Sequence, residues 1–194
     1  MTFDLIIQNV SRYISLTREE EGFFISMLQS GHAGKKTFLL QEGEVCRYTY
    51  FVMSGCLRGY SNDKNGVEHT LIFAPRDWWI SDIYSAVTQK PGMLNIEAIE
   101  DTELLMLSNE NRELLFTRLP KFERFFRILV EKSLVNMQQR ILDNMSLTAE
   151  ERYQSFCTRY PGLADKLTSK QIASYIGVTP EFYSKMRARL AKKS

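Results

Sequence analysis

Glu181 and Lys185 are two side chains whose types and spacing could do recognisable chemistry. They are four residues apart, which places them on one face of a helix. A carboxylate can accept a hydrogen bond from the amino group of cytosine, and an ammonium group can donate to the acceptors of guanine. Thr179 and Phe182 fall on the same side of such a helix. These residues could therefore meet base edges in a groove of DNA.

Two short predicted helices around a tight turn must hold these side chains. Thr168 can cap the first helix, and Gln171 completes a capping box. Gly177 ends it, because glycine adopts left-handed backbone angles without strain. Thr179 can cap the second helix, and Pro180 suits its first position. The residues predicted to form the buried face are Ile172, Ala173, Ile176, Val178, Tyr183 and Met186. This spacing resembles the helix-turn-helix of bacterial repressors and activators.

A larger set of residues is expected to contact DNA around this reading face. Arg187 and Arg189, with Lys192 and Lys193, are expected to meet phosphates, which orient a protein without reading sequence. The start of the first helix could add contacts through exposed amides. The predicted DNA-binding residues are Ser169, Lys170, Gln171, Thr179, Pro180, Glu181, Phe182, Ser184, Lys185, Arg187 and Arg189.

The charge distribution favours a polyanionic partner. From residue 166 to the end of the chain, seven Lys or Arg residues face one acid, so this segment carries a net charge of +6. The whole chain carries +2, which leaves −4 for the first 165 residues. Phosphate neutralisation supplies most non-specific DNA affinity, so the asymmetry indicates DNA. The alternative is a solvated helical end with favourable cations near its C-terminus.

The composition limits the remaining function classes. An apolar fraction of 44% with 25% charged residues is ordinary for a globular protein. The N-terminus does not resemble a signal peptide, and no stretch reaches the roughly 20 apolar residues that a membrane span needs. Three scattered cysteines are expected to be reduced, and the protein to be cytoplasmic. The chain lacks the usual phosphate-loop, zinc-protease and nucleophile motifs, so we expect neither an enzyme nor a metal site.

The body of the chain predicts a helical start followed by strands. Residues 1–30 read as helical, with Thr17 and Glu20 as a capping box and with Gly31 and Gly34 ending the helix. Short β-rich stretches then alternate with turns up to residue 107. The predicted strands are 37–40, 48–53, 56–60, 67–73 and a region within 94–107, with a hairpin turn at 62–66. Regular short strands of this kind indicate an antiparallel sandwich or roll.

Helices return after the strands, at 109–116, at 121–145 and from Thr148 to about residue 160. The 121–145 helix would be about 36 Å long at about 1.5 Å per residue. Its apolar stripe comprises Val130, Leu134, Met137, Ile141 and Met145. The stripe could pack on the roll, but the length favours a partner helix from a second subunit.

These predictions combine into an α+β fold. It consists of an antiparallel β-roll (a double-stranded β-helix, jelly-roll-like) flanked by helices, a long dimerisation helix and a C-terminal all-α helix-turn-helix domain. The expected division is a β-roll sensor domain at 1–119, the dimerisation helix at 120–145 and the DNA-binding domain at 146–194.

This order of elements resembles the Crp/Fnr superfamily of bacterial transcription regulators. The motifs that carry the resemblance are 42–44, 50–55, 64–66 and 97–104 in the roll and 168–187 near the end. The resemblance implies a cyclic-nucleotide-binding-like domain that controls DNA binding in response to a small-molecule effector. It also implies a homodimer on a palindromic operator, with RNA polymerase as a further partner. Many members continue into a β-hairpin wing, which is not expected in a chain that ends at Ser194.

The resemblance also defines a candidate effector pocket. Members that bind cyclic AMP carry a Gly-Glu-Leu turn and, about ten residues later, an Arg before a small residue. The corresponding turn has Ser81 and Asp82 in place of Gly and Glu, and Lys90 is the only cation between Ile83 and Glu97. The predicted pocket residues are Trp79, Ser81, Asp82, Ile83, Lys90 and Asn95.

Losing the guanidinium removes a bidentate contact to the cyclic phosphate. We therefore expect cyclic AMP to bind weakly or not at all, and a true cyclic AMP sensor with a divergent pocket is the alternative. Trp78 and Trp79 could stack on an aromatic effector or could fill the end of the roll. Neither an iron–sulfur cluster, which needs about four thiolates, nor a haem is assigned.

Overall fold

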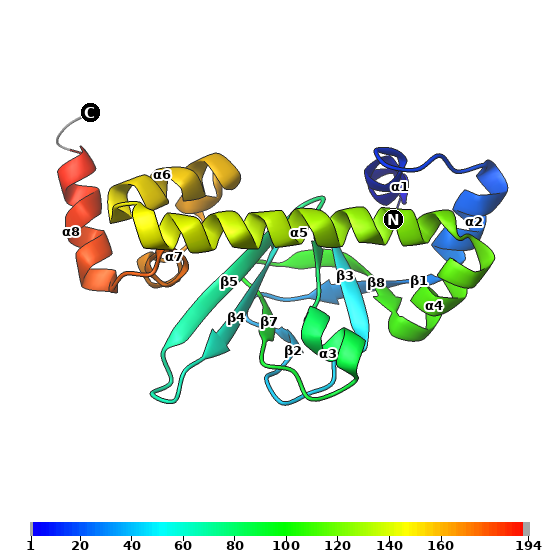
Figure 1. Ribbon diagram of the computed structural model, residues 1–194, viewed down its shortest axis with the longest axis horizontal. Coiled ribbons are helices and arrows are strands. Elements are labelled where there is room, and N and C mark those ends of the chain that lie inside the picture. Colours follow the sequence, from blue (N-terminus) through cyan, green and yellow to red (C-terminus); the bar gives the residue numbers. More distant parts are fainter. Residues whose placement is uncertain (1, 192–194) are drawn as a thin grey trace. The chain divides into compact units, whose positions relative to one another are not determined.

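The computed structural model describes residues 2–191 and divides into two compact units. One unit comprises Met1–Gly59 and Phe73–Ser133, and the other comprises Tyr60–Ile72 and Leu134–Ser194. Figure 1 shows the elements, which in chain order are α1 (Asp4–Ser11), α2 (Arg18–Ser26), β1 (Leu28–Ala33), β2 (Phe38–Leu40), β3 (Tyr48–Ser54), β4 (Cys56–Asn62), β5 (Glu68–Pro75), β6 (Trp79–Ile80), α3 (Ile83–Thr88), β7 (Asn95–Ala98), β8 (Thr102–Ser108), α4 (Asn109–Arg118), α5 (Lys121–Ser146), α6 (Ala149–Arg159), η1 (Leu163–Asp165), α7 (Ser169–Ile176) and α8 (Pro180–Ala191).

The strands form two four-stranded sheets, with the orders β1-β8-β3-β6 and β2-β7-β4-β5. β8 pairs antiparallel with both β1 and β3, and β2 pairs antiparallel with β7. Strands that are neighbours in a sheet are mostly distant in sequence, which is the pattern of a roll. The predicted α+β fold with a β-roll is confirmed.

The prediction that residues 1–30 are helical up to Gly31 is wrong at its end. The helices stop at Ser11 and Ser26, and Leu28–Ala33 forms strand β1. This strand pairs residue by residue with β8, from Leu28 opposite Leu107 to Ala33 opposite Thr102. A Cβ atom at Gly31 would lie 3.0 Å from Leu104 Cδ1, so this glycine lets a side chain of β8 approach. Pairing with a distant strand overrode the local helical pattern.

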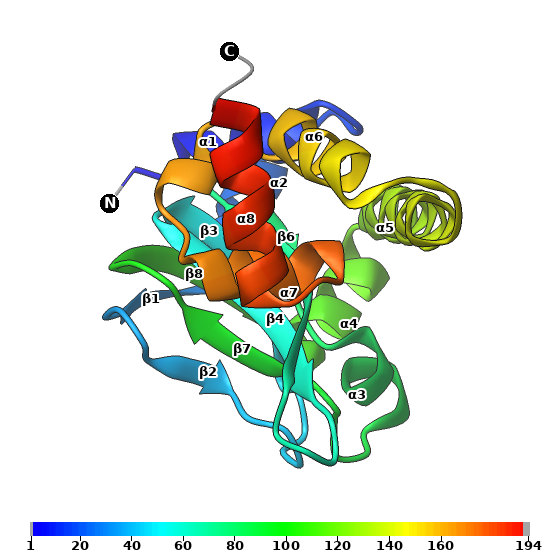
Figure 2. The ribbon, with the colours of Figure 1, turned by 90° about the vertical axis from the view of Figure 1, so that its left-hand side faces the viewer.

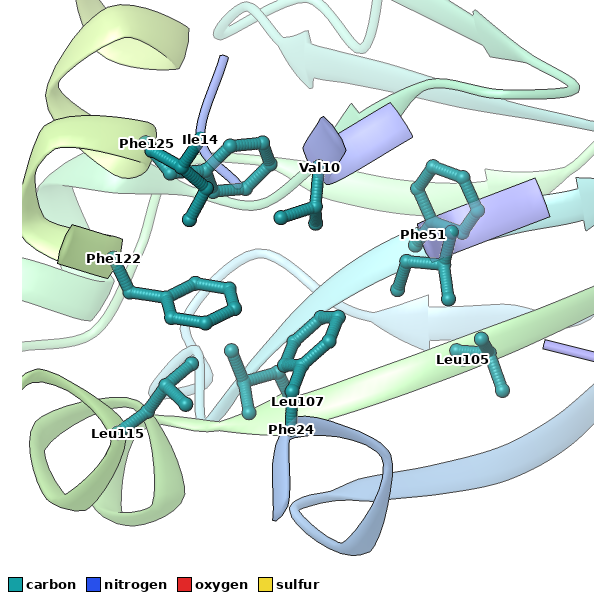
Figure 3. Packing of buried hydrophobic residues seen from close by; sticks show 10 residues of the cluster. Val10, Ile14, Phe24, Phe51, Leu105, Leu107, Leu115, Phe122 and Phe125 are labelled. Atoms are coloured by element: carbon teal, nitrogen blue, oxygen red, sulfur yellow. The ribbon is translucent and has the colours of Figure 1, made fainter. Parts of the chain in front are cut away.

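An aromatic and aliphatic cluster forms the core of the first unit (Figure 3). It joins the N-terminal helices and the first turns of α5 to one sheet of the roll. Its fully buried or nearly buried members are Ile6, Val10, Ile14, Phe24, Phe51, Leu105, Leu107, Leu115, Phe122 and Phe125. The rings of Phe24 and Phe122 lie 4.7 Å apart between centroids, which is close aromatic packing. This cluster fixes the start of α5.

The second unit contains the C-terminal helices and the hairpin of residues 60–72. Capping boxes start α6 at Thr148 and α7 at Thr168, as predicted. Figure 2 shows α7 and α8 crossing, with α6 beside them. The side chains that fill their interface include Tyr153, Phe156 and Tyr175, all buried. Phe156 and Tyr175 pack with ring centroids 5.3 Å apart.

Two side chains of this unit bind the backbone of β5. The hydroxyl of Ser174 accepts from the amide of Thr70 at 2.8 Å and donates to the carbonyl of Glu68 at 2.6 Å. Arg140 donates to the carbonyls of Thr70 and Leu71 and to that of Tyr175. Polar side chains thus take the place of a neighbouring strand along this part of β5.

No helix among residues 2–191 combines the length and apolarity that a membrane crossing would need. Within the same residues, no three His, Cys, Asp or Glu side chains gather as metal ligands would.

Candidate nucleic-acid interface and effector region

The turn between α7 and α8 has the geometry of a helix-turn-helix. Gly177 has φ +71° and ψ +43°, the left-handed conformation that ends α7. The hydroxyl of Thr179 accepts from the amide of Phe182 at 3.2 Å, and Pro180 is the first residue of α8. Val178 donates through its amide to the carbonyl of Ala173 at 3.0 Å, which closes the turn. The predicted helix limits and caps are confirmed.

The apolar face of this motif is buried and the opposite face of α8 is exposed. Tyr183 and Met186 are buried from α8, as are four residues of α7, namely Ile172, Ala173, Tyr175 and Ile176. Glu181 and Lys185 are exposed, and 46% of the Phe182 surface is accessible. The pKa of Glu181 lies below its ordinary value because its own backbone amide, the Thr179 hydroxyl and the charge of Lys185 favour the carboxylate. The carboxylate is therefore available as a hydrogen-bond acceptor at neutral pH.

Four other predicted DNA contacts already have partners within the second unit, namely Lys170, Ser184, Arg187 and Arg189. The Ser184 hydroxyl donates to the carbonyl of Pro180 at 2.9 Å, along its own helix. The Arg187 guanidinium lies 5.0 Å from the centre of the Tyr153 ring and donates to its hydroxyl. This contact holds α8 against α6, and because Arg187 is exposed, its phosphate contact stays a prediction.

Lys170 and Arg189 form exposed ion pairs. Lys170 lies 2.6 Å from Glu68, and Arg189 lies 3.3 Å from Glu150. Exposed pairs of this kind contribute about 0–1 kcal/mol, so a phosphate can replace the carboxylate. Ser169, Gln171 and Thr179 serve as helix-start residues, with Gln171 closing the capping box. Lys192 and Lys193 lie outside the described residues.

The far half of α5 exposes an apolar stripe. Leu134 and Ile141 are 54% and 53% accessible, and Met137 and Met145 are also exposed. Val130, one turn earlier, is exposed too. Helical residues spaced by three or four positions form one continuous face. Exposed faces of large apolar side chains are typical of protein–protein interfaces.

In the candidate effector region, Asp82 is a buried structural residue. Only 2% of its surface is accessible. Its carboxylate caps α3 by accepting from the amide of Ser85 at 3.0 Å, and it also accepts from the amides of Met93 and Leu94. A Cβ atom at Gly92 would lie 2.4 Å from Asp82 Oδ2. The chain after α3 therefore closes over the carboxylate, which has no room left for a sugar hydroxyl.

The other predicted pocket residues do not converge on one point. Trp79 packs against Phe51 and Phe125, and its indole nitrogen donates to Asn9 Oδ1 at 3.0 Å. It therefore belongs to the core of the first unit, as the packing interpretation expects, and not to a ligand pocket. Ile83 and Lys90 are exposed.

Asn95 and Ser81 complete the predicted set. Asn95 is buried, and its side-chain oxygen accepts a hydrogen bond from the amide of Glu42 at 3.0 Å. This bond connects β7 to the turn before β3. Ser81 is half-buried beside the cap of α3. Neither residue offers the positive charge that a cyclic phosphate needs.

The buried guanidinium of the roll was not among the predicted site residues. Arg58 in β4 is 4% accessible, and its Nη2 lies 2.8 Å from Glu97 Oε2 in β7. The Glu97 carboxylate neutralises the charge of Arg58, so this buried pair would attract an anionic ligand only weakly. The one available signal was an arginine in the middle of an otherwise apolar strand, at 56–60.

Comparison with known proteins gives this arrangement its context. Residues 32–118 match the Cyclic nucleotide-binding domain family. FixK2 from Bradyrhizobium japonicum is 20% identical with a TM-score of 0.76, and the match covers 86% of this chain and 85% of FixK2. A protein from Eubacterium rectale, assigned to the Crp/Fnr family of transcriptional regulators, is 20% identical with a TM-score of 0.74, covering 92% of this chain and 85% of its own.

The chain has the Crp/Fnr fold. CLP, the c-di-GMP responsive global regulator of Xanthomonas campestris, shares this fold at 13% identity and a TM-score of 0.74. That match covers 91% of this chain and 93% of CLP. None of the curated proteins matches the chain by sequence.

Within the Crp/Fnr fold, the family match at 32–118 runs from the last two residues of β1 to the end of α4 and so includes all the other strands of the roll. The predicted resemblance is confirmed at the level of the fold. The predicted division at residues 120 and 146 and the predicted site residues remain predictions.

Proposed function

We propose that the protein is a DNA-binding transcription regulator of the Crp/Fnr type that works as a homodimer and responds to an effector through its roll. One observation carries the proposal: a capped, well-packed helix-turn-helix exposes Glu181, Phe182 and Lys185 on one side of α8. In such motifs the second helix lies in the major groove with its first residues at base edges. Bacterial DNA lies in the cytoplasm, which is where we place the protein.

The exposed apolar face of α5 supports the same proposal. Two copies that bury the stripe of Leu134, Met137 and Ile141 against each other would remove three large exposed apolar side chains per subunit from water. A two-fold dimer places two recognition helices about one DNA turn apart and requires a palindromic operator. RNA polymerase is a further partner of a regulator that activates, and we propose no catalytic activity.

Lys185 and Arg189 are expected to divide the work of binding. Lys185→Ala should lower the preference for the selected operator over other sequences by about 1–3 kcal/mol at each half-site, because a base-edge donor is lost. Arg189→Ala should weaken binding to all DNA sequences by the same factor. It should also lower the number of counterions released on binding by about one per subunit. Fluorescence anisotropy against operator and scrambled DNA at several salt concentrations measures both effects.

Arg127→Ala is the matched control, since this exposed arginine pairs with Glu131 on α5 and is not among the predicted DNA contacts. The assigned roles are wrong if Lys185→Ala and Arg189→Ala weaken operator and scrambled DNA by equal factors.

Cyclic AMP is expected to produce no heat of binding and no thermal shift. The carboxylate of Asp82 already accepts hydrogen bonds from three backbone amides, and Glu97 neutralises the charge of the buried Arg58. Titration calorimetry on the full chain tests this, with c-di-GMP as a second ligand because CLP, of the same fold, responds to it. Saturable micromolar binding of cyclic AMP that disappears in Asp82→Ala would favour the alternative of a true cyclic AMP sensor.

A further inference from the structure

Three arginines gather around one small cavity in the second unit. Arg140 comes from α5, Arg152 and Arg159 come from α6, and all three are half-buried. Asn144 and Ser155 add polar side chains to the wall. The cavity measures about 30 Å³. A single buried water needs roughly 10–15 Å³ of such space, so the cavity has room for two or three waters or for the oxygens of one small anion.

The positive charge around this cavity exceeds the negative charge. Among residues 2–191, none of the three arginines forms an ion pair with a carboxylate. Asp143 is the acid that lines the cavity, and its carboxylate also accepts from Gln139 at 2.8 Å. Three guanidinium groups thus share one carboxylate in a partly enclosed space, where Coulomb repulsion is less screened than in water.

Backbone carbonyls hold the arginines in place without neutralising them. Arg140 donates to Tyr175 and Arg152 to Ile176, each at 2.8 Å, and these are the last two carbonyls of α7. The negative end of a helix dipole offsets only about half a charge. The two arginines therefore close the end of α7 and still leave positive charge at the cavity.

Unused donors remain for a ligand. A guanidinium has five N–H groups. In the described part of the chain, Arg159 makes one hydrogen bond, from Nη1 to the carbonyl of Asn136 at 3.5 Å. The Nε of Arg140 is buried and meets no acceptor within residues 2–191. The pKa of Arg140 lies below its ordinary value because burial disfavours its charge and the nearby charge of Arg159 adds to the shift.

We propose that this cavity binds a phosphate-type oxyanion, held by Arg140, Arg152 and Arg159. Arg152 and Arg159 keep paired N–H groups that match phosphate oxygens in a bidentate geometry. The Nη groups of Arg140 already donate to three carbonyls, so Arg140 contributes its buried Nε and its charge. A dianion would relieve the repulsion among the three cations. The space accepts phosphate oxygens but no base or sugar, so the rest of a larger ligand must lie outside it. The phosphate can belong to a small molecule or to a DNA backbone. This site is separate from the exposed face of α8 and goes beyond the proposed function.

The test uses the full chain in phosphate-free buffer. Inorganic phosphate is titrated by ³¹P NMR and calorimetry, with chloride at matched ionic strength as the reference. We expect saturable binding of phosphate, competition by sulfate and no response to chloride. Arg159→Gln should weaken the binding about tenfold, because one charge-assisted pair is lost. Asp143→Asn should tighten it, because it removes the carboxylate that opposes an anion.

Arg124→Gln is the control, because this exposed arginine of α5 lies in the first unit and does not line the cavity. Circular dichroism checks that the Arg159→Gln protein is folded. If it is not folded, the tighter phosphate binding expected of Asp143→Asn still tests the proposal. Equal phosphate binding in wild type, Arg159→Gln and Asp143→Asn would overturn the proposal. So would the absence of phosphate binding together with unchanged DNA binding in Arg159→Gln.

DNA titrations separate the two sources of the phosphate. If Arg159→Gln weakens DNA binding and lowers the salt slope by about 0.9 per subunit, the cavity takes a backbone phosphate. If DNA binding is unchanged while phosphate binding falls, the ligand is a small phosphorylated molecule. The titration with inorganic phosphate does not depend on the proposed function, so the two can fail separately.

Discussion

The Ile141→Glu variant is expected to be monomeric and to bind palindromic operator DNA at least about 100-fold more weakly than wild type. Ile141 lies within the exposed stripe on α5, between Met137 and Met145. In a two-fold dimer each substitution would place a carboxylate against the same face of the partner, and an unpaired buried charge costs several kcal/mol. Linking two half-site contacts raises avidity by about 10²–10⁴, and a monomer loses that gain.

Sedimentation velocity gives the oligomeric state, and anisotropy with full and half operators gives the affinity. Gln139→Glu is the charge control, because it adds the same charge to the same helix on the side away from the stripe. It also removes the hydrogen bond from Gln139 to Asp143, so circular dichroism is used to check that this variant is folded. A monomeric Ile141→Glu protein that keeps full operator affinity would show that the dimer is not needed for binding. A dimeric one would show that α5 is not the interface.

The Gly55→Ala variant is expected to lose about 3 kcal/mol or more of unfolding free energy. Gly55 joins β3 to β4 with φ +86°, a backbone conformation that a side chain disfavours. The space is also filled, since a Cβ atom there would lie 2.4 Å from the carbonyl oxygen of Asp101 and 2.5 Å from Thr102 Oγ1. The first of these contacts is with backbone, so relief requires the turn or the start of β8 to move.

Thermal unfolding monitored by circular dichroism measures the effect, which corresponds to a fall of roughly 6–12 °C in Tm for a chain of this size. Gly66→Ala separates dihedral strain from steric clash, because Gly66 has φ +75° and open space around its Cβ position. We expect Gly66→Ala to cost about 1–2 kcal/mol. Equal losses in the two variants would mean that the turn around Gly55 adjusts and that the clash is not a constraint.

The sequence predicted best where structure depends on neighbouring residues. The caps at Thr148 and Thr168, the stop at Gly177 and the hairpin after Asn62 all rest on side chains that bond or bend the backbone within a few positions. These signals were sufficient for the helix-turn-helix and for most strands, because the physical cause lies inside the motif itself.

Features that depend on distant partners could not be predicted in the same way. The strand at Leu28–Ala33 exists because it pairs with β8, from Leu28 opposite Leu107 to Ala33 opposite Thr102. Trp79 could stack on a ligand or fill a core, and only its contacts with Phe51 and Asn9 decide between the two. The three arginines of the cavity lie on two helices and carry no shared motif, so only the folded unit brings them together.

The backbone contacts of Ser174 and Arg140 also bear on how the protein behaves at high concentration. β5 is the outermost strand of its sheet in the described residues, and an unpaired strand edge is a template for joining another chain. Here the amide of Thr70 and the carbonyls of Glu68, Thr70 and Leu71 are already bonded to side chains. At residues 68–71 the backbone groups are therefore not available to an added strand, so two polar side chains hinder strand addition along this part of the edge without a covering strand.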